Sequence, residues 1–403
     1  MEESAERVQV WWPLLPYAEG LSTELAERGY TPRSVVNHLR LLAHLSRWLA
    51  RQNLEPGELT LQRVEQFLAA RRAAGYTCWL TPRGLSPLLS YLRGLGVVPD
   101  PPPRIASSPL EVLLSDYRGY LIRERGLVAG TMHNYETVAR RFLSEWAKGG
   151  ELDLEGLVAA DVTRFLQREF RDGHARGAKL LVTGMRSLLR YLHLEGRTAR
   201  QLAPVVPATA GWRGSSLPRG LEPEQVARLL ASCDRRTAVG SRDYAILVLL
   251  VRLGLRAQEV ASLELEDIDW SGGEVVVRGK GRREERLPLP VDVGEALVDY
   301  LRHGRPSSQC WRLFVRAIAP HHEVTNRAVG DVVRSACVRA GLPEVGAHRL
   351  RHTAATEMLR AGVPLPEVGQ VLRHRSLSTT AIYAKVDEKQ LRSLARPWPG
   401  GAA

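Results

Sequence analysis

The C-terminal half of the chain is organised around residues 348–383, which read HRLRHTAATEMLRAGVPLPEVGQVLRHRSLSTTAIY. Within this stretch His348, Arg351 and His352 are spaced i, i+3 and i+4, so a helix would carry all three on one face. The glycine at 362 and the proline at 364 predict the end of that helix. The sequence therefore predicts a helix that presents two imidazoles and one guanidinium to the same side.

A second short helix is expected over residues 365–372, leading to His374, and a last helix is expected to carry Tyr383. An arginine held beside imidazoles suits a phosphate group, because its planar fork matches two oxygens and it keeps its charge. A tyrosine can be a covalent nucleophile at phosphorus when cationic donors stabilise the charge that builds on the phosphoryl oxygens. These residue types, in this order, favour phosphodiester chemistry.

The same stretch resembles the signature of the tyrosine recombinases, the phage-integrase and Xer-like enzymes. Their pattern is His-x-x-Arg-His, then a histidine in a Leu-x-His-x-x-Leu-Ser-Thr-Thr context, then a tyrosine nine residues after that histidine. This chain has HRLRH at 348–352, LRHRSLSTT at 372–380, and Tyr383 nine residues after His374. The match is dense and in order, so it is specific to this family.

The resemblance implies a role for each residue. Tyr383 would be the nucleophile, Arg351 and His374 would stabilise the phosphoryl oxygens, and His348 would handle protons. His348 and His352 could also be metal ligands at i, i+4, but no nearby carboxylate completes a zinc triad. His352 is instead expected to be a buried structural residue, hydrogen-bonded near Arg351.

A second match lies upstream, in GLRAQEV at residues 254–260. It resembles the family's Gly-x-Arg-x-x-Glu box, which implies that Arg256 is the first catalytic arginine and that Glu259 steadies the site by hydrogen bonding. By itself, an Arg-x-x-Glu spacing is more typical of an exposed i, i+3 ion pair. Its position ahead of residues 348–383, in the family's order, favours the catalytic interpretation.

Residues 274–278 and 286–290 are predicted to form a β-hairpin around the turn Gly279-Lys280-Gly281. This resembles the family's hairpin, which implies that Lys280 is the catalytic lysine. The composition adds an argument, because the chain has 5 lysines against 51 arginines. A lysine with a lowered pKa can release a proton near neutral pH and an arginine cannot, so Lys280 would protonate the leaving 5′ hydroxyl. The alternative is a solvated lysine in a turn.

The N-terminal half contains a repeat, over residues 31–99 and 129–198, in which each copy is expected to hold about four helices. Three blocks match in order: LSRW at 45–48 with LSEW at 143–146, Val64, Phe67, Leu68 and Gly75 with Val162, Phe165, Leu166 and Gly173, and LLSYL at 88–92 with LLRYL at 188–192. We expect the aromatic residues to pack in the core of each copy, with base stacking as the alternative: Trp48, Tyr91, Trp146 and Tyr191.

The expected fold is mainly α, with two N-terminal helical (core-binding-like) domains and a small β-hairpin or sheet in a C-terminal tyrosine-recombinase catalytic domain. The expected boundaries are 1–103 and 107–203 for the helical domains, 204–220 for a linker, 221–395 for the catalytic domain and 396–403 for a tail. The first helical domain could grip DNA outside the crossover site, or hold neighbouring protomers together. Plausible phosphate contacts are Arg140, Arg141, Lys179, Arg186 and Arg190 in the second helical domain, and Arg282 and Arg283 in the hairpin turn.

Charge and cysteine usage agree with a DNA-binding protein of the bacterial cytoplasm. The formal net charge of +12 suggests a polyanionic partner, although an arginine-rich solvated surface would give the same figure. The four cysteines have no CxxC spacing, so neither a zinc site nor a disulfide framework is expected. No secretory leader and no apolar run of 18 residues is recognised, and the run AILVLLV at 245–251 is expected to be a buried helix.

The sequence thus predicts a site-specific DNA recombinase that cuts and rejoins DNA through a 3′-phosphotyrosyl link, without a metal or other cofactor. The resemblance implies a homotetramer on double-stranded DNA that works through a Holliday junction, and the additional helical domain favours a mobile-element integrase. Two other functions remain open: relaxation of DNA in the manner of a type IB topoisomerase, and DNA binding without catalysis.

Overall fold

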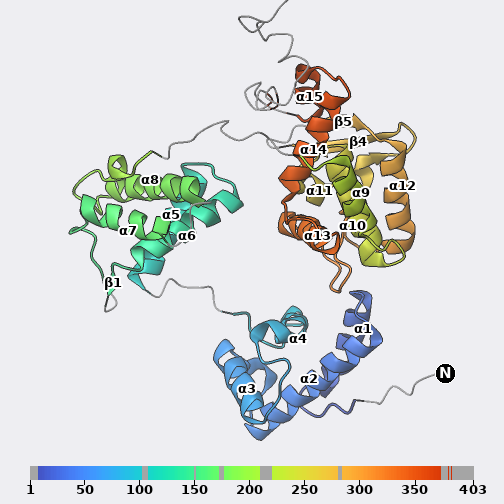
Figure 1. Ribbon diagram of the computed structural model, residues 1–403. Helices are drawn as coiled ribbons and strands as arrows, with labels where there is room; N and C mark the ends of the chain where they lie inside the picture. The colour runs from blue at the N-terminus through green and yellow to red at the C-terminus, as the bar shows by residue number, and fades with distance from the viewer. Residues whose placement is uncertain are drawn as a thin grey trace, which may run out of the picture. The chain divides into compact units, whose positions relative to one another are not determined.

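The computed structural model describes residues 8–101, 108–148, 151–171, 177–208, 220–279 and 284–373, together with residues 380 and 383. These residues are mainly helical, and a small antiparallel sheet lies in the C-terminal part of the chain (Figure 1). Buried hydrophobic side chains form three large clusters, which span residues 10–98, 113–206 and 221–350. The predicted fold class is confirmed.

The first helical unit contains four α-helices around its own core: α1 (Ala18–Glu27), α2 (Pro32–Arg51), α3 (Leu61–Ala73) and α4 (Pro82–Gly94). Their starts follow from sequence, because Thr31 precedes a proline at the first helical position and its hydroxyl accepts from the Ser34 amide at 3.3 Å. Thr60 caps α3 in the same way through the Arg63 amide. Short 3-10 turns, η1 (Leu15–Tyr17) and η2 (Pro56–Glu58), complete the unit.

The second helical unit has the same order of helices: α5 (Pro109–Arg123), α6 (Ala129–Leu143), α7 (Ala159–Arg171) and α8 (Ala178–Leu194). A two-stranded ribbon of β1 (Ala147–Lys148) and β2 (Glu151–Leu152) stands between α6 and α7. Adding 98 to the bounds of α3 gives the bounds of α7, as the predicted repeat requires. Each predicted copy holds three α-helices rather than four, because α1 and α5 lie ahead of the matched blocks.

Matched positions of the repeat are buried in both units. Phe67 and Phe165 are each 2% exposed, and Leu92 and Leu192 are each fully buried. The aromatic residues assigned to the cores, Trp48, Tyr91, Trp146 and Tyr191, all pack in or against them. The core-packing interpretation of these four residues is therefore confirmed.

The core of the second helical unit extends past residue 203. A 3-10 turn, η4 (Ala203–Val205), packs against α8, and Val206 is 1% exposed in the same core. Residues 203–206, which include the first residues of the predicted linker, thus contribute apolar side chains to this core.

The C-terminal unit begins with α9 (Pro223–Ala231), α10 (Ala238–Arg252) and α11 (Ala257–Ser262). After a short 3-10 turn, η5 (Leu265–Asp267), come β3 (Ile268–Asp269), β4 (Glu274–Arg278) and β5 (Glu284–Pro288). The chain then continues through α12 (Val291–Asp299), a π-helical turn η6 (Tyr300–Gly304), α13 (Asn326–Arg339), α14 (Ala347–Arg360) and α15 (Leu365–Val371).

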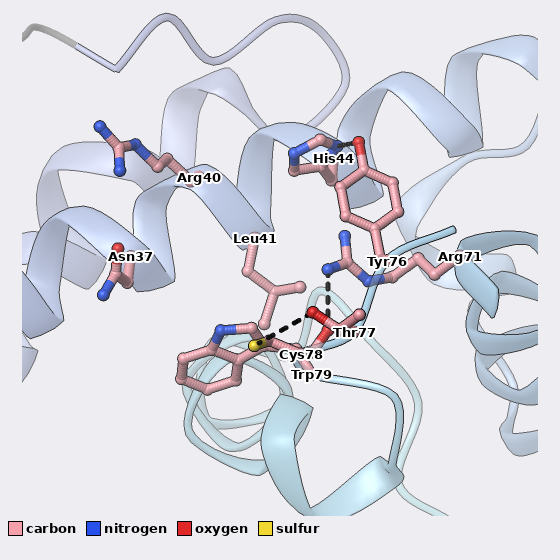
Figure 2. A pocket seen from close by; sticks show the side chains of 9 residues that line it. All are labelled: Asn37, Arg40, Leu41, His44, Arg71, Tyr76, Thr77, Cys78 and Trp79. Carbon is pink, nitrogen blue, oxygen red and sulfur yellow. Dashed lines mark hydrogen bonds between the residues drawn. The ribbon is translucent and has the colours of Figure 1, made fainter. Parts of the chain in front are cut away.

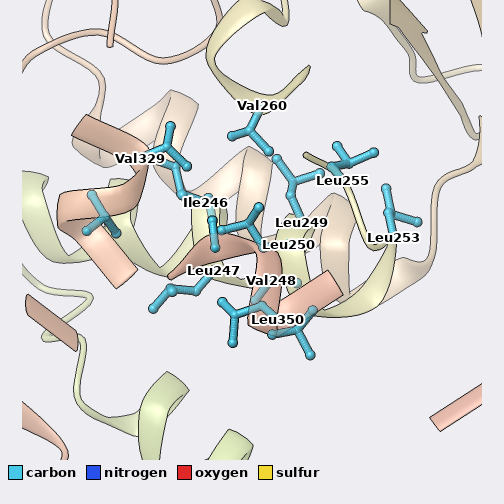
Figure 3. Close-up of a cluster of buried hydrophobic side chains, with 14 of the residues drawn as sticks. Ile246, Leu247, Val248, Leu249, Leu250, Leu253, Leu255, Val260, Val329 and Leu350 are labelled. Atoms are coloured by element: carbon cyan, nitrogen blue, oxygen red, sulfur yellow. The ribbon is translucent and has the colours of Figure 1, made fainter. Parts of the chain in front are cut away.

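Helix α10 is the centre of this unit and packs against α9, α11, α12, α13 and α14. Its residues 245–251 are all buried, as expected from their apolar run. Figure 3 shows residues 246–250 in one cluster with Val329 of α13 and Leu350 of α14. The helix begins at Ala238, seven residues before that run. The reason is a cap at Thr237, whose hydroxyl accepts from the Gly240 amide at 3.0 Å.

The small sheet has the order β3-β4-β5 and is antiparallel throughout. Val276 pairs with Arg286, while Val275 and Val277 point into the core and are fully buried, as a half-buried strand requires. The second hairpin strand begins at Glu284, two residues before the predicted position, because Glu284 still pairs with Arg278. β3 was not predicted, since two residues are too few for a visible alternation.

None of the helices in the described part of the chain has both the length and the apolar character needed to span a membrane.

Candidate active site

Arg256 and Glu259 come together at the start of α11. Glu259 Oε2 accepts from the Arg256 backbone amide at 2.8 Å, and its Oε1 accepts from Arg256 Nη1 at 2.5 Å. The first bond satisfies a helix N-terminal amide that has no partner within the helix. Because the Arg256 side chain is still 42% exposed, its guanidinium can also contact a ligand.

Glu259 also binds a second arginine. Arg373 Nη2 donates to Glu259 Oε2 at 2.7 Å, and both side chains are only 4% exposed. Burial alone would raise the pKa of Glu259, but Arg373 and Arg256 together hold that pKa below its ordinary value. The carboxylate therefore stays ionised and links the two arginines.

Arg351 is buried at 1% exposure on α14 and bonds to two backbone carbonyls. It donates from Nη1 to the Gly254 oxygen at 2.5 Å and from Nη2 to the Leu372 oxygen. The turn at Gly254 has a φ of +58°, and an added Cβ would lie 2.6 Å from a methyl carbon of Leu372. Glycine is therefore needed there, since the left-handed backbone and the close approach both exclude a side chain. Burial, and then the neighbouring Arg256 and Arg373, lower the pKa of Arg351 to about 10, so it remains charged at neutral pH.

The two histidines of α14 lie side by side, and one of them contacts the tyrosine. The ring centroids of His348 and His352 are 4.5 Å apart in an edge-on arrangement. His352 Nδ1 lies 2.7 Å from Tyr383 Oη, within hydrogen-bond distance. Tyr383 is itself buried at 1% exposure, against a small apolar cluster that includes Ala355.

The contacts of His352 differ from the expected ones, and its structural role stays a prediction. It was predicted to be a buried structural residue bonded near Arg351, but its ring is only partly buried and its contact is with Tyr383. Tyr383 lies beside residue 352 of α14, with ring centroids 5.4 Å apart. Spacing along α14 predicts which residues share a face, but it does not predict which of them the tyrosine will meet.

The protonation states at this contact follow from burial. Burial, then His348 and nearby arginines, lower the pKa of His352 to about 4, so this imidazole is neutral at pH 7. Burial raises the pKa of Tyr383 to about 12, against the opposing effect of Arg351. The site therefore pairs a neutral phenol with a neutral imidazole at hydrogen-bond distance.

Arg373 is a residue of the site that sequence reasoning missed. It stands directly before His374, and its φ of +55° is unusual for a residue other than glycine. Its backbone carbonyl accepts from Arg256 Nη2 at 3.2 Å, while its side chain reaches Glu259. The motif leaves this position open between Leu372 and His374. The one signal in the sequence is that an arginine occupies position 373, directly after the helix predicted to end at residue 372.

Four of the predicted catalytic residues are thus within one cluster of contacts with Tyr383: Arg256, Glu259, His348 and Arg351. Lys280, His374, Arg282 and Arg283 lie outside the described residues. In the described part of the chain, no group of three or more histidine, cysteine, aspartate or glutamate side chains could hold a metal ion.

The basic residues predicted to contact phosphate in the second helical unit fall into two sets. Arg140 pairs with Glu111 and Glu136, Arg141 pairs with Glu169 at 2.6 Å, and Arg186 donates to the Val206 carbonyl at 2.9 Å. Lys179 and Arg190 are exposed on α8. The first set is engaged within the protein and the second faces solvent.

Comparisons with known proteins identify the family of the chain. Residues 219–390 match the model described as the phage integrase family. The chain is 41% identical over 402 residues to the putative integrase/recombinase y4rA of Sinorhizobium fredii, which covers 96% of this chain and 94% of that protein. It is also 33% identical to the tyrosine recombinase XerA of Thermococcus kodakarensis, over 71% of this chain and 94% of that protein.

Solved structures agree on the fold. The XerH site-specific recombinase bound to a palindromic difH substrate matches with a TM-score of 0.53 at 20% identity, over 85% of this chain and 97% of that chain. A lambda integrase fragment bound to a core site gives the same TM-score at 17% identity, over 72% of this chain and 98% of that one. With full-length similarity to an integrase and a cationic cluster around one buried tyrosine, this chain belongs to the phage integrase family of tyrosine recombinases.

Proposed function

We propose that this protein is a site-specific DNA recombinase that cuts and rejoins DNA through a 3′-phosphotyrosyl intermediate. The observation that supports this most is the position of the Tyr383 phenol, 2.7 Å from a neutral imidazole and next to a buried, charged arginine. A phenol in that position has a proton acceptor beside it and a cation to stabilise the charge that develops on phosphate oxygens.

The proposed chemical step uses Tyr383, His352, Arg256 and Arg351 as the described residues, and assigns Lys280 and His374 their roles from the sequence motifs. Tyr383 Oη attacks the scissile phosphorus while its proton passes to His352 Nδ1, and the bond from phosphorus to the 5′ oxygen breaks. Arg256, Arg351 and His374 stabilise the charge on the non-bridging oxygens. Lys280 gives a proton to the departing 5′ oxygen. The link to Tyr383 keeps the ester energy, so the 5′ hydroxyl of a partner strand can reverse the step without ATP.

His352 rather than His348 is proposed as the partner of the phenol, because it is the histidine within hydrogen-bond distance. His348 lies behind it, edge-on, and burial lowers its pKa as well. In this arrangement His348 fixes the orientation of the His352 ring and can pass the proton onward.

The biological setting is also a proposal. Similarity to a putative integrase/recombinase along almost the whole chain, first helical unit included, supports integration or excision of a mobile element. We propose that four protomers act on two double-stranded sites and exchange strands in pairs through a Holliday junction. No metal and no other cofactor takes part in the proposed step.

The test is a nicked duplex that carries the sequence flanking the gene, since a nick lets the cleaved fragment leave and traps the adduct. The wild-type chain should form a covalent complex that survives denaturation, and Tyr383→Phe should form none. Duplex binding should stay within about twofold, because one phenolic oxygen adds little to affinity that phosphate contacts dominate. A covalent adduct with the Phe variant would refute the assignment of the nucleophile. Relaxation of a plasmid without a recombination site would instead indicate a topoisomerase.

A further inference from the structure

A pocket opens in the first helical unit, between α2 and the loop that follows α3. It has a volume of about 260 Å³ and is lined by Asn37, Arg40, Leu41, His44, Arg71, Tyr76, Thr77, Cys78 and Trp79. Figure 2 shows Asn37, Arg40 and His44 projecting from α2, opposite Tyr76, Thr77 and Trp79 of the loop. The lining residues include two arginines and a histidine, and none of them is an aspartate or glutamate.

Arg71 gives the pocket a buried positive charge that forms no ion pair with a carboxylate of the described residues. The residue is 6% exposed, and its Nη2 donates to the Cys78 carbonyl at 3.1 Å. Its Nε and Nη1 have no hydrogen-bond partner among the described residues. The guanidinium lies 4.2 Å from the centre of the Tyr76 ring, an attractive contact that leaves the charge in place.

An uncompensated buried cation is unfavourable, so its retention calls for a reason beyond stability. An anion in the pocket would supply the missing charge. The volume is below the roughly 300 Å³ at which pockets for drug-sized ligands begin, so it suits one phosphate with part of its sugar and not a base pair. The Thr77 hydroxyl and the Asn37 amide can donate to phosphate oxygens beside the arginines.

The second helical unit shows that the repeat does not require this pocket. At the offset of 98, Arg71 corresponds to Glu169, which is neutralised by Arg141 at 2.6 Å. His44 corresponds to Phe142, which is fully buried against Phe165 with ring centroids 5.1 Å apart. The second unit therefore fills the corresponding space with an aromatic ring and a paired charge, and the pocket is a property of the first unit.

We propose that the pocket formed by α2 and residues 76–79 binds a phosphodiester group of the DNA backbone, so that the first helical unit is a DNA-binding unit in its own right. Arg71 supplies the charge at the base of the pocket, and the side chains of Asn37, His44 and Thr77 line the space around the phosphate. The proposal rests on the proposed function in one respect only, namely that DNA is the polyanion the protein meets.

The test measures binding of the full chain to duplex DNA of arbitrary sequence, as a function of salt, in the Tyr383→Phe background so that no cleavage occurs. Arg71→Met keeps the bulk of the side chain and removes its charge. It should weaken binding about tenfold, and the slope of log affinity against log salt should fall by about 0.9, the loss of one phosphate contact. Arg71→Lys should retain most of the affinity and the slope.

Two further variants keep the test decisive. Arg51→Met removes an exposed arginine of α2 outside the pocket, and affinity should change less than twofold. Should Arg71→Met fail to fold, Arg71→Gln carries the test, because its amide can still donate to the Cys78 carbonyl while the charge is gone, and it should lower the slope in the same direction. Slopes for the pocket variants equal to that of Arg51→Met would overturn the proposal.

Two other outcomes can be distinguished from phosphate binding in the pocket. A change in protomer association with an unchanged salt slope would mean that the pocket holds a carboxylate of a protein partner, which also overturns the proposal. The adduct that wild-type protein forms with nicked DNA, scored in parallel, reports on the proposed function alone. If wild-type protein forms no such adduct while Arg71→Met still lowers the affinity and the salt slope, the phosphate pocket is supported and the recombinase function is refuted.

Discussion

The catalytic unit and the second helical unit hold their arginines in different ways. Around the active site, Arg256 and Arg373 share a single carboxylate, Glu259, whereas Arg351 donates to the backbone carbonyls of Gly254 and Leu372. In the second helical unit, four arginines face four glutamates: Arg118, Arg140, Arg141 and Arg168 with Glu136, Glu111, Glu169 and Glu145. The active site keeps positive charge, and the helical unit cancels it.

This difference separates two uses of the same side chain. A backbone carbonyl is neutral, so it orients a guanidinium without neutralising it, and the charge stays available to a phosphate. A carboxylate orients and neutralises at once, so such an arginine stabilises the fold and attracts DNA only weakly. Arginine content alone therefore says little about where this protein binds DNA.

The largest effect should follow from removing a carbonyl-held arginine. We expect Arg351→Lys to lower the rate of adduct formation on nicked DNA by about 10³-fold, because one ammonium cannot span both the Gly254 and Leu372 carbonyls and still face the phosphate. Single-turnover cleavage at saturating DNA measures this rate.

The matched control is Arg252→Lys at the end of α10, where an exposed arginine pairs with Asp292 at 2.5 Å. That change should alter the rate less than twofold, since it weakens a surface ion pair. A cleavage rate for Arg351→Lys within tenfold of the wild-type rate would show that the guanidinium held by these two carbonyls is not essential to the reaction.

An intermediate effect should follow from breaking the buried pair of Arg373 and Glu259. We expect Arg373→Met to lower the free energy of unfolding by about 3 kcal/mol, because a buried carboxylate loses one of its two cations. Adduct formation should slow as well, since the Arg256 guanidinium depends on the same carboxylate. Chemical denaturation measures the first change, and single-turnover cleavage measures the second.

The pH dependence of this pair has a definite sign. The pKa of Glu259 in the folded protein lies below its ordinary value of 4.5, so the pair contributes fully above pH 4.5. That contribution is lost as the pH falls through the lower folded value. The stability difference between wild type and Glu259→Gln should therefore shrink below pH 4.5, and a difference that stays constant down to pH 3 would contradict the ionised pair.

Sequence could predict the parts of this site that depend on spacing. The helix that carries His348, Arg351 and His352, and the turn at Gly254, follow from local periodicity and from the order of the motifs. The partners of Glu259 do not, because Arg373 is 114 residues away and reaches it only through a left-handed turn after α15. The contact between His352 and Tyr383 likewise depends on how α15 folds back.

The same limit applies to the helical units. The repeat predicted which side chains are buried, since both copies share their apolar positions. It could not predict that Arg140 would bind Glu111, 29 residues earlier on another helix, and so be engaged within the protein. Charge partners across helices depend on packing angles, which no spacing in one chain encodes.

The smallest effects should separate the two sets of basic residues in the second helical unit. We expect Lys179→Ala and Arg190→Ala each to reduce the salt slope of DNA binding by about 0.9, because both side chains are exposed and neither forms an ion pair within the described residues. Arg141→Ala should leave the slope unchanged and lower stability by about 1 kcal/mol or less, because its charge is already cancelled by Glu169. Equal slopes for Arg141→Ala and Arg190→Ala would mean that the ion pair opens on DNA. In that case the glutamates of this unit compete with phosphate for the arginines, and Glu111→Gln should then tighten binding.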